Sequence, residues 1–341
     1  LLFFPAAALE NYALFLAALY ILTFGLAFLE TTANPFILSM GDEATATQRL
    51  NLAQAFNPLG ALMGLLVAQT FILGSLQSDD VDAQGNGIYE TLSSTAKAAV
   101  KTADLELIRN PYVALGIFVL LLLVLITFVK MPEESKSHET SNMWESIKRI
   151  YKKEHFVGGV IAQLFYVGAQ IMCWTYIYQY AENINIDNVS AGYYQMIAFI
   201  IFFVGRAIGT YLLKYIKAGN LLTFFAILAA IFTLGAIIIQ GIVGLCFLVG
   251  VSFFMSINFP TIYGLSLNNL NVEESKIGSA GLIMAIVGGA LMPKLQAIII
   301  DIGGYAVNDI KFLGIPEINL SFFLPILCFI FIARFGFSNN S

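Results

Sequence analysis

The sequence predicts an all-α integral membrane protein, and composition and hydropathy together lead to this class. Of the 341 residues, 58% are hydrophobic and only 11% are charged, whereas about 25% of the residues of soluble domains are charged. The mean hydropathy is +0.80. The apolar residues form long uninterrupted runs, which are typical of membrane helices and unlike the alternating pattern of a β-barrel strand.

Nine of these runs are long enough to cross a bilayer, because about 20 apolar residues span its hydrocarbon core. A shorter apolar stretch at residues 1–8 resembles the end of a helix that began earlier, so we expect the chain to be part of a longer protein. The predicted spans are 12–38, 48–74, 111–130, 156–180, 190–215, 221–240, 243–267, 277–301 and 319–336.

Two hydrophilic segments interrupt the spans. Residues 75–110 form a polar insert, with a short helix expected near 89–108, and residues 131–155 form a basic linker. Lys and Arg residues of short loops mark the cytoplasmic side of a membrane protein. With the linker in the cytoplasm, strict alternation of the spans places eleven Lys and Arg residues inside and four outside. We therefore expect an inner (plasma) membrane protein whose linker and C-terminus are cytoplasmic and whose polar insert is external.

An internal repeat predicts that the chain contains two related halves. Residues 25–30 (GLAFLE) align with residues 250–255 (GVSFFM), and Pro35 then aligns with Pro260. Duplicated halves of this kind are common in transporters. The predicted parts are an incomplete N-terminal helical half at 1–130, the linker at 131–155, and a six-helix C-terminal half at 156–341.

Glu30 is the single charged residue between Tyr12 and Leu38, inside the first predicted span. A carboxylate inside a membrane costs about 3 kcal/mol on insertion scales, so it should face a watery cavity or a partner. Taking up a proton removes this cost, which predicts a role for Glu30 in proton coupling. The alternative is a buried glutamate that only hydrogen-bonds a neighbouring helix. Met255 occupies the position of Glu30 in the repeat, which favours a specific role.

Three amide side chains follow on the next predicted helix. Asn51, Gln54 and Asn57 are spaced three residues apart, which places them on one face. Amides offer both donors and acceptors to the hydroxyl groups of a sugar. We predict sugar contacts for Gln54 and Asn57, whereas Asn51 lies nearer the cytoplasmic end. The alternative is that the amides only join helices by hydrogen bonds.

A second polar stripe lies on the first span of the C-terminal half. Gln163, Tyr166, Gln170 and Trp174 recur at steps of three and four residues. Aromatic rings stack on the apolar face of a pyranose while amides bind its hydroxyls, so this face is predicted to contact substrate. Packing against neighbouring helices is the alternative for about half of these residues.

Arg206 and two glycine pairs fall within the remaining spans. Arg206 is expected either to reach the cytoplasmic interface or to pair with a carboxylate. The pairs Gly60/Gly64 and Gly205/Gly209 have the spacing of close helix–helix contacts.

Three further polar residues lie in the last helices. Asn258 is a candidate substrate contact beside Pro260, and this proline is expected to bend its helix and free a backbone carbonyl. Lys294 and Asp301 are seven residues apart on one face, where a structural ion pair is favoured over a substrate site.

No catalytic or cofactor-binding pattern occurs in the sequence. It shows no nucleophile–base arrangement, no phosphate-binding glycine loop and no metal-ligand spacing, and the three cysteines are scattered singly through apolar runs. No basic run is typical of nucleic-acid binding. We therefore predict that the protein is not an enzyme and that it holds no cofactor or metal.

Four motifs resemble one family. The runs LETTANPF (29–36) and RLNLAQAFN (49–57), followed by YVGAQ with CWT (166–175) and FFMSINFPTI (253–262), are similar to motifs of the fucose permease family. These proteins are sugar–proton symporters of the major facilitator superfamily and include glucose/galactose permeases. The resemblance covers nearly the whole chain.

The resemblance implies twelve helices in two pseudo-symmetric halves, with the end of helix 3 and helices 4–6 in 1–130 and helices 7–12 in 156–341. Glu30 would be the coupling carboxylate, with Gln54, Asn57, Gln170 and Trp174 around a central sugar cavity. The implied function is import of L-fucose or a glucose- or galactose-type hexose with a proton. The expected partners are the monosaccharide, the proton and the lipid bilayer, and a monomer is expected. The alternatives are a non-transporting sugar sensor of the same fold and a transporter of another small solute.

Overall fold

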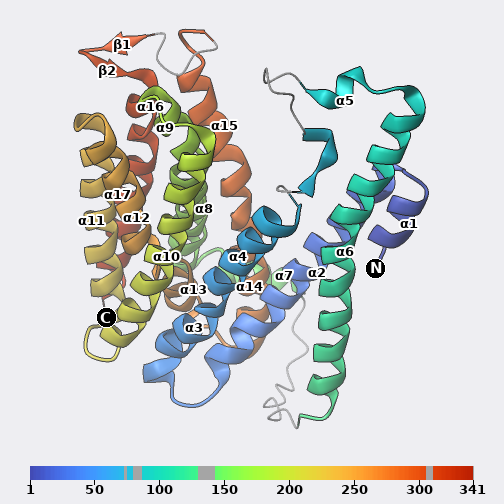
Figure 1. The fold of residues 1–341 in the computed structure, drawn as a ribbon. Helices are drawn as coiled ribbons and strands as arrows, with labels where there is room; N and C mark the ends of the chain where they lie inside the picture. The colour runs from blue at the N-terminus through green and yellow to red at the C-terminus, as the bar shows by residue number, and fades with distance from the viewer. Residues whose placement is uncertain (73–74, 80–86, 130–142, 305–309, 341) are drawn as a thin grey trace. The chain divides into compact units, whose positions relative to one another are not determined.

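A computed structural model describes residues 1–72, 75–79, 87–129, 143–304 and 310–340 (Figure 1). Within these ranges, nine helical segments are long and apolar enough to cross a membrane, which confirms the predicted all-α class and number of spans. They are Tyr12–Ser39, Glu43–Ile72, Ser94–Thr127, Glu154–Asn183, Asn188–Leu212, Ala218–Ile238, Ile242–Leu267, Val272–Ile300 and Glu317–Ser338.

Packing divides the chain into two compact units. The first contains Leu1–Leu29 and Met63–Lys136, and the second contains Glu30–Leu62 and Ser137–Ser341. Packing is a different criterion from sequence repetition, so the predicted division into halves around residues 131–155 stays a prediction. Residues 131–142 of the predicted linker lie outside the described ranges.

The first unit is built on one long helix. Its elements are α1 (Phe3–Ala8), the beginning of α2 (Tyr12–Ser39), the end of α4 (Phe56–Val67), one π-helical turn (Ala68–Ile72), a 3-10 turn (Gln77–Asp79), α5 (Ile88–Thr91) and α6 (Ser94–Thr127). The ring of Phe3 stacks on that of Tyr112 with centroids 4.1 Å apart. Nearby, Lys101 pairs with Glu10 at 2.8 Å. These contacts pack α1 against α6.

Helix α6 corrects the prediction of a short helix near 89–108 followed by a separate span at 111–130. Both are parts of one 34-residue helix, which begins after the N-cap Ser93 and contains Pro111. A proline inside a helix removes one backbone hydrogen bond, and the long apolar run on its C-terminal side continues the helix. Residues 80–86 of the predicted insert lie outside the described ranges.

The second unit contains the main apolar core. It begins with the end of α2 and a 3-10 turn at Glu43–Thr45. The other elements are α3 (Ala46–Gln54), the start of α4, α7 (Met143–Ile150), α8 (Glu154–Thr175), α9 (Ile177–Asn183), α10 (Asn188–Leu212), α11 (Ala218–Ile238), α12 (Ile242–Met255), α13 (Asn258–Leu267), α14 (Val272–Met284), α15 (Gly288–Ile300), α16 (Glu317–Ser321) and α17 (Phe323–Ser338). Helix α11 packs against α12 and α17, and α8 packs against α13, α15 and α17.

Most long spans of this unit are interrupted helices. The break between α12 and α13 precedes Pro260 and confirms the predicted bend. A 3-10 turn at Ala285–Val287 joins α14 to α15. Helix α10, which is not interrupted, begins with a side-chain cap. Asp187 accepts a 2.8 Å hydrogen bond from the Ser190 amide at the start of α10, and this bond lowers the pKa of the Asp187 carboxyl.

A small hairpin, which the sequence analysis does not predict, lies between α15 and α16. Strands β1 (Lys311–Phe312) and β2 (Ile315–Pro316) pair antiparallel, with Lys311 opposite Pro316. Leu313 and Gly314 form the turn with φ of 52° and 79°. Two residues at positive φ match the right-handed twist of a hairpin.

The two glycine pairs differ in their surroundings. A Cβ added to Gly205 of α10 would meet the backbone oxygen of Phe253 at 2.6 Å, and one added to Gly209 would overlap Ile257. The predicted close contact is therefore confirmed for this pair. It is wrong for Gly60/Gly64, since a Cβ at either would meet no described atom within 4 Å.

Candidate functional site

Glu30 lies in α2 and is partly buried. Its side chain forms no hydrogen bond and no ion pair with any residue that the structure describes. The Tyr263 hydroxyl of α13 lies within electrostatic range of Glu30. The carboxyl group is therefore not locked to a permanent positive charge.

A hydrogen-bonded chain holds the surroundings of Glu30. The hydroxyls of Tyr263 and Ser279 are bonded to each other, and Ser279 donates to the backbone oxygen of Thr31 at 2.9 Å. A serine hydroxyl has one proton to donate, so Tyr263 is the donor in its bond with Ser279. Tyr263 is fully buried. Because its proton is committed to Ser279, the Tyr263 oxygen stays available as an acceptor within electrostatic range of Glu30.

One turn further along α2, Asn34 is 3% exposed and accepts a 2.8 Å hydrogen bond from the Gln54 side chain. The Asn34 amide nitrogen has no partner among the described residues. The sequence analysis does not single out Asn34, although it lies four residues after Glu30 and so shares its helix face. The amide of Gln54, a predicted sugar contact, is thus already bonded to α2 in this structure.

The other two amides of the predicted face lie in different environments. Asn51 is fully buried and donates to Thr261 Oγ1 at 3.2 Å and to the Thr47 carbonyl at 2.9 Å. This is the interhelical role that the sequence left open. Asn57, at the start of α4, is exposed, and its side chain makes no bond to the described chain.

The stripe on α8 separates into packed and unpartnered residues. Tyr166 is fully buried and donates to the Met255 carbonyl at 2.9 Å. Trp174 donates its indole N–H to Ser252 Oγ at 3.1 Å. Gln170 is partly exposed and has no hydrogen-bond partner in the described part of the chain. Tyr166 and Trp174 therefore attach α8 to α12.

Gln163 and Asn258 are both 0% exposed, and neither amide has a partner for its oxygen or its nitrogen within the described ranges. Buried polar groups are nearly always hydrogen-bonded to protein, water or a ligand. Gln163 lies on α8 and Asn258 at the first turn of α13, two helices that pack against each other. Both predicted contacts thus offer unused donors and acceptors inside the second unit.

Arg206 follows neither sequence expectation. It is 3% exposed, so it does not reach the interface, and it forms no ion pair within the described residues. Its guanidinium donates to two backbone oxygens and lies 4.7 Å from the Phe202 ring centroid. Trp174 also contacts the Phe202 ring, at 5.1 Å between centroids.

Lys294 and Asp301 do not pair. Both are exposed on α15 and its C-cap, and no ion pair joins them in the structure. The expected structural bridge is therefore absent between these two described residues. Seven residues along a helix is about 10 Å, which is farther than the side chains reach when each extends into solvent.

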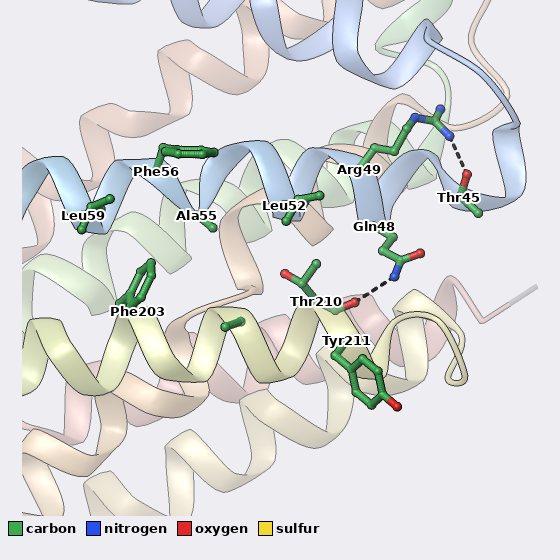
Figure 2. A pocket seen from close by; sticks show the side chains of 11 residues that line it. Thr45, Gln48, Arg49, Leu52, Ala55, Phe56, Leu59, Phe203, Thr210 and Tyr211 are labelled. Carbon is green, nitrogen blue, oxygen red and sulfur yellow. Dashed lines mark hydrogen bonds between the residues drawn. The ribbon is translucent and has the colours of Figure 1, made fainter.

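A pocket of about 710 Å³ lies between the α3–α4 segment and α10 (Figure 2). Its lining is mostly apolar, and its polar groups are largely used locally. Gln48 donates to the Thr210 carbonyl at 3.2 Å, and Arg49 donates to Thr45 and to backbone oxygens. No predicted site residue lines this pocket, so it is distinct from the predicted sugar contacts. Its lining residues are Thr45, Gln48, Arg49, Leu52, Ala55, Phe56, Leu59, Phe203, Ala207, Thr210 and Tyr211.

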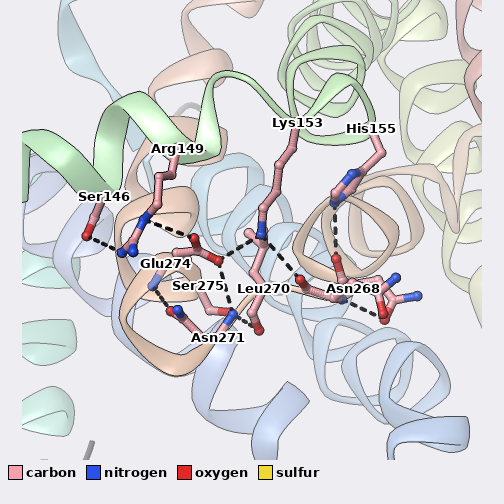
Figure 3. Close-up of polar contacts among 10 residues, drawn as sticks. Ser146, Arg149, Lys153, His155, Asn268, Leu270, Asn271, Glu274 and Ser275 are labelled. Carbon is pink, nitrogen blue, oxygen red and sulfur yellow. Dashed lines mark hydrogen bonds and ion pairs between the residues drawn. The ribbon is translucent and has the colours of Figure 1, made fainter. Parts of the chain in front are cut away.

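A charged cluster joins α7 to the start of α14 (Figure 3). Glu274 is 5% exposed and pairs with Lys153 at 2.8 Å and with Arg149 at 3.6 Å. It also completes a capping box with Asn271. The sequence analysis misses this cluster, although the Asn-x-x-Glu spacing is a recognisable helix start.

The residues that precede α14 also contact His155. A ring nitrogen of His155 lies 3.1 Å from the Asn268 carbonyl oxygen, and Figure 3 draws this contact.

In the described residues, no group of three or more His, Cys, Asp and Glu side chains could hold a metal ion.

Comparison with known proteins places this geometry in context. The profile of the Major Facilitator Superfamily matches residues 1–293. An L-fucose-proton symporter of Haemophilus influenzae is 50% identical over 337 residues, covering 98% of this chain and 77% of the relative. An L-fucose-proton symporter of Escherichia coli is 35% identical, covering 98% of this chain and 74% of that protein. The crystal structure of a Major Facilitator Superfamily transporter in the outward conformation superposes with a TM-score of 0.86 at 32% identity, covering 100% of this chain and 79% of that structure.

Proposed function

Because the chain belongs to the major facilitator superfamily, we propose that it imports a neutral monosaccharide by proton symport with alternating access. L-Fucose is the first candidate, since the similar symporters are named for it. A glucose- or galactose-type hexose is the second, from the motif resemblance. The observation that supports coupling most directly is Glu30, a carboxyl group in a membrane-length helix with no counter-ion among the described residues.

Glu30 would act by changing its charge. A charged carboxylate at membrane depth costs about 3 kcal/mol, which corresponds to about a hundredfold in the population of a closed, dehydrated state. Protonation removes the charge, so the loaded carrier reorients. The Tyr263 oxygen, whose own proton is used toward Ser279, offers an acceptor for the protonated carboxyl group. Loss of the proton on the cytoplasmic side then completes the inward half of the cycle, and the empty carrier returns to the outward state.

The sugar would be bound by unused amides and by an aromatic ring. Gln163 and Asn258 supply buried donors and acceptors, while Gln170 and Asn57 supply more accessible ones. Trp174 is held in place by Ser252 and by Phe199 and Phe202. A ring fixed in this way loses little entropy when a pyranose stacks against it.

An anionic solute is disfavoured by the charges of the structure. Arg206 is buried and already bonded to backbone oxygens, and Lys294 is exposed on α15. A carrier of anions needs paired cations that face its substrate. Neutral sugar is therefore the better candidate.

We place loop 131–155 and the C-terminus in the cytoplasm, on the distribution of Lys and Arg. The cluster around Glu274 supports a common side for α7 and the start of α14, because Lys153 and Arg149 bind it. We also infer that the protein functions as a monomer, with the lipid bilayer as its surroundings.

Uptake by proteoliposomes tests the proposal. The full-length protein is reconstituted, and accumulation of labelled L-fucose is measured with an inward proton gradient, with an inward sodium gradient and without a gradient. Accumulation driven only by the proton gradient, and inhibited by unlabelled fucose more than by glucose or galactose, is the expected result. Binding without uptake would assign a sensor, and uptake insensitive to all three sugars would assign another solute.

A further inference from the structure

Two prolines leave two backbone carbonyls without a helical donor. Pro58 is four residues after Gln54, and Pro260 is four residues after Ser256. A proline has no N–H, so the carbonyl four residues before it lacks its α-helical hydrogen bond. The helix breaks are at these places, between α3 and α4 and between α12 and α13. Inside a membrane such carbonyls need another donor.

One side chain supplies both donors. Arg206 of α10 donates from Nε to the Ser256 oxygen at 2.6 Å and from Nη1 to the Gln54 oxygen at 2.6 Å. Its approach is made possible by Gly205, whose missing Cβ leaves room for the Phe253 backbone. A planar guanidinium holds two acceptors in fixed directions, which an ammonium cannot do.

One of the two bonds joins residues on the same side of the linker in the sequence, and the other joins residues on opposite sides of it. Arg206 and Ser256 both follow the linker at 131–155, whereas Gln54 precedes it. The adjacent bonds Gln48 to Thr210 and Asn51 to Thr261 run in the same direction, from α3 to α10 and α13. Helix α3 is thus fastened along its length to the C-terminal part of the second unit.

We propose that Arg206 is a lock residue that holds α3 against the α12–α13 break in this conformation, and that alternating access requires its bond to the Gln54 carbonyl to open. This inference rests on the proposed transport function, because only a carrier whose halves move relative to each other must break it. The lock uses the proline-freed carbonyl as its acceptor. It therefore depends on Pro58 as much as on Arg206.

The test measures the packing of α3 on α13 and needs no transport. Asn51→Cys and Thr261→Cys are introduced into the full-length protein after Cys173, Cys246 and Cys328 are replaced by Ala. The side chains at 51 and 261 touch in this structure, so copper-phenanthroline oxidation reports how often α3 is docked. Cross-linking rates in native membranes are then compared between variants.

Arg206→Lys keeps the positive charge but cannot hold two acceptors, and Pro58→Ala restores an N–H that competes for the Gln54 carbonyl. Each is expected to lower the cross-linking rate about tenfold, the effect of losing one charge-assisted bond. The double variant should match the single variants, because both remove the same bond. Pro293→Ala, a proline inside α15 away from this joint, is the control and should leave the rate unchanged.

An unchanged rate in Pro58→Ala would overturn the lock, and so would additive effects of the two substitutions. If Arg206→Lys fails to fold, Pro58→Ala decides alone, since it leaves Arg206 in place. A lowered rate in a protein that moves no sugar would retain the lock and overturn the proposed transport. Normal uptake with unchanged cross-linking in both variants would retain transport and overturn the lock.

Discussion

The hydroxyl of Ser279 donates a 2.9 Å hydrogen bond to the backbone oxygen of Thr31, the residue that follows Glu30. This bond ties α14 to α2 beside the carboxyl group, and it fixes the direction in which Tyr263 donates its proton. The hydroxyls of Ser279 and Tyr263 therefore have defined donor directions, and that of Tyr263 lies within electrostatic range of Glu30. No cation among the described residues forms an ion pair with Glu30.

Glu30→Gln is expected to abolish uphill sugar accumulation while leaving sugar exchange across the membrane intact. Glutamine mimics the protonated carboxyl group permanently, so the carrier reorients but no longer transfers a proton. Proton-gradient-driven accumulation and counterflow of labelled sugar are measured in the same vesicles. Glu182→Gln, at an exposed position of α9, is the matched control. Normal accumulation in Glu30→Gln would remove this residue from the coupling role.

Gln163→Leu should stabilise the protein and weaken sugar binding. The buried amide has no partner for either polar atom in the described structure, and removing an unsatisfied polar group of this kind gains about 1 kcal/mol or more. A sugar-contacting amide would at the same time be lost from the site. Thermal unfolding in detergent and calorimetric titration with sugar measure the two effects.

Asn258→Leu is the parallel variant for α13, because Asn258 is equally buried and its amide has no partner in the part of the chain that the structure describes. Asn51→Leu provides the contrast, since Asn51 bonds to Thr261 and should lose stability instead. Unchanged sugar affinity in both Gln163→Leu and Asn258→Leu would exclude these amides from the site.

Gly205→Ala should destabilise the protein by about 1–3 kcal/mol, the usual cost of overpacking. The added methyl group would meet the Phe253 backbone oxygen at 2.6 Å, and a backbone atom cannot turn aside as a side chain can. Gly60→Ala is the control, because its added methyl group meets no described atom within 4 Å. That substitution should be neutral or should gain up to about 1 kcal/mol from helix propensity. Equal melting temperatures for the two variants would contradict the packing at α10.

Glu274→Gln should loosen α7 and lower stability by about 1 kcal/mol. Glu274 is buried, but Lys153 and Arg149 are partly exposed at 32% and 49% of their side chains, so solvent screening reduces the strength of the pairs. Hydrogen exchange over residues 143–153 and thermal unfolding at low and high salt measure the change. Glu145→Gln, at an exposed position of the same helix, should leave exchange unaltered. Equal exchange in both variants would show that the cluster does not anchor α7.

The sequence predicted helices and helix breaks correctly where a local pattern of residues determines them. The nine spans follow from apolar length, and the break before Pro260 follows from the missing N–H of proline. The separate helices expected near 89–108 and at 111–130 were wrong, because Pro111 does not end a helix whose apolar run continues past it. The roles of Asn51, Tyr166 and Arg206 depend on bonds to residues that are distant in the sequence. The long-range partners of Asn51 and Tyr166 are 89 or more residues away, and those of Arg206 are 50 or more residues away.

The sequence by itself determined that this chain is a bundle of membrane helices with one carboxyl group deep in an apolar run, because chain hydropathy and a lone charge can be read without any contact. Its motifs also predicted the family that the comparisons confirmed. Only the tertiary structure decided which polar groups are free and which are used. It bonded Arg206 to two proline-freed carbonyls and left the amides of Gln163 and Asn258 without partners among the described residues. The availability of a hydrogen-bonding group depends on neighbours that helix packing brings from distant parts of the chain.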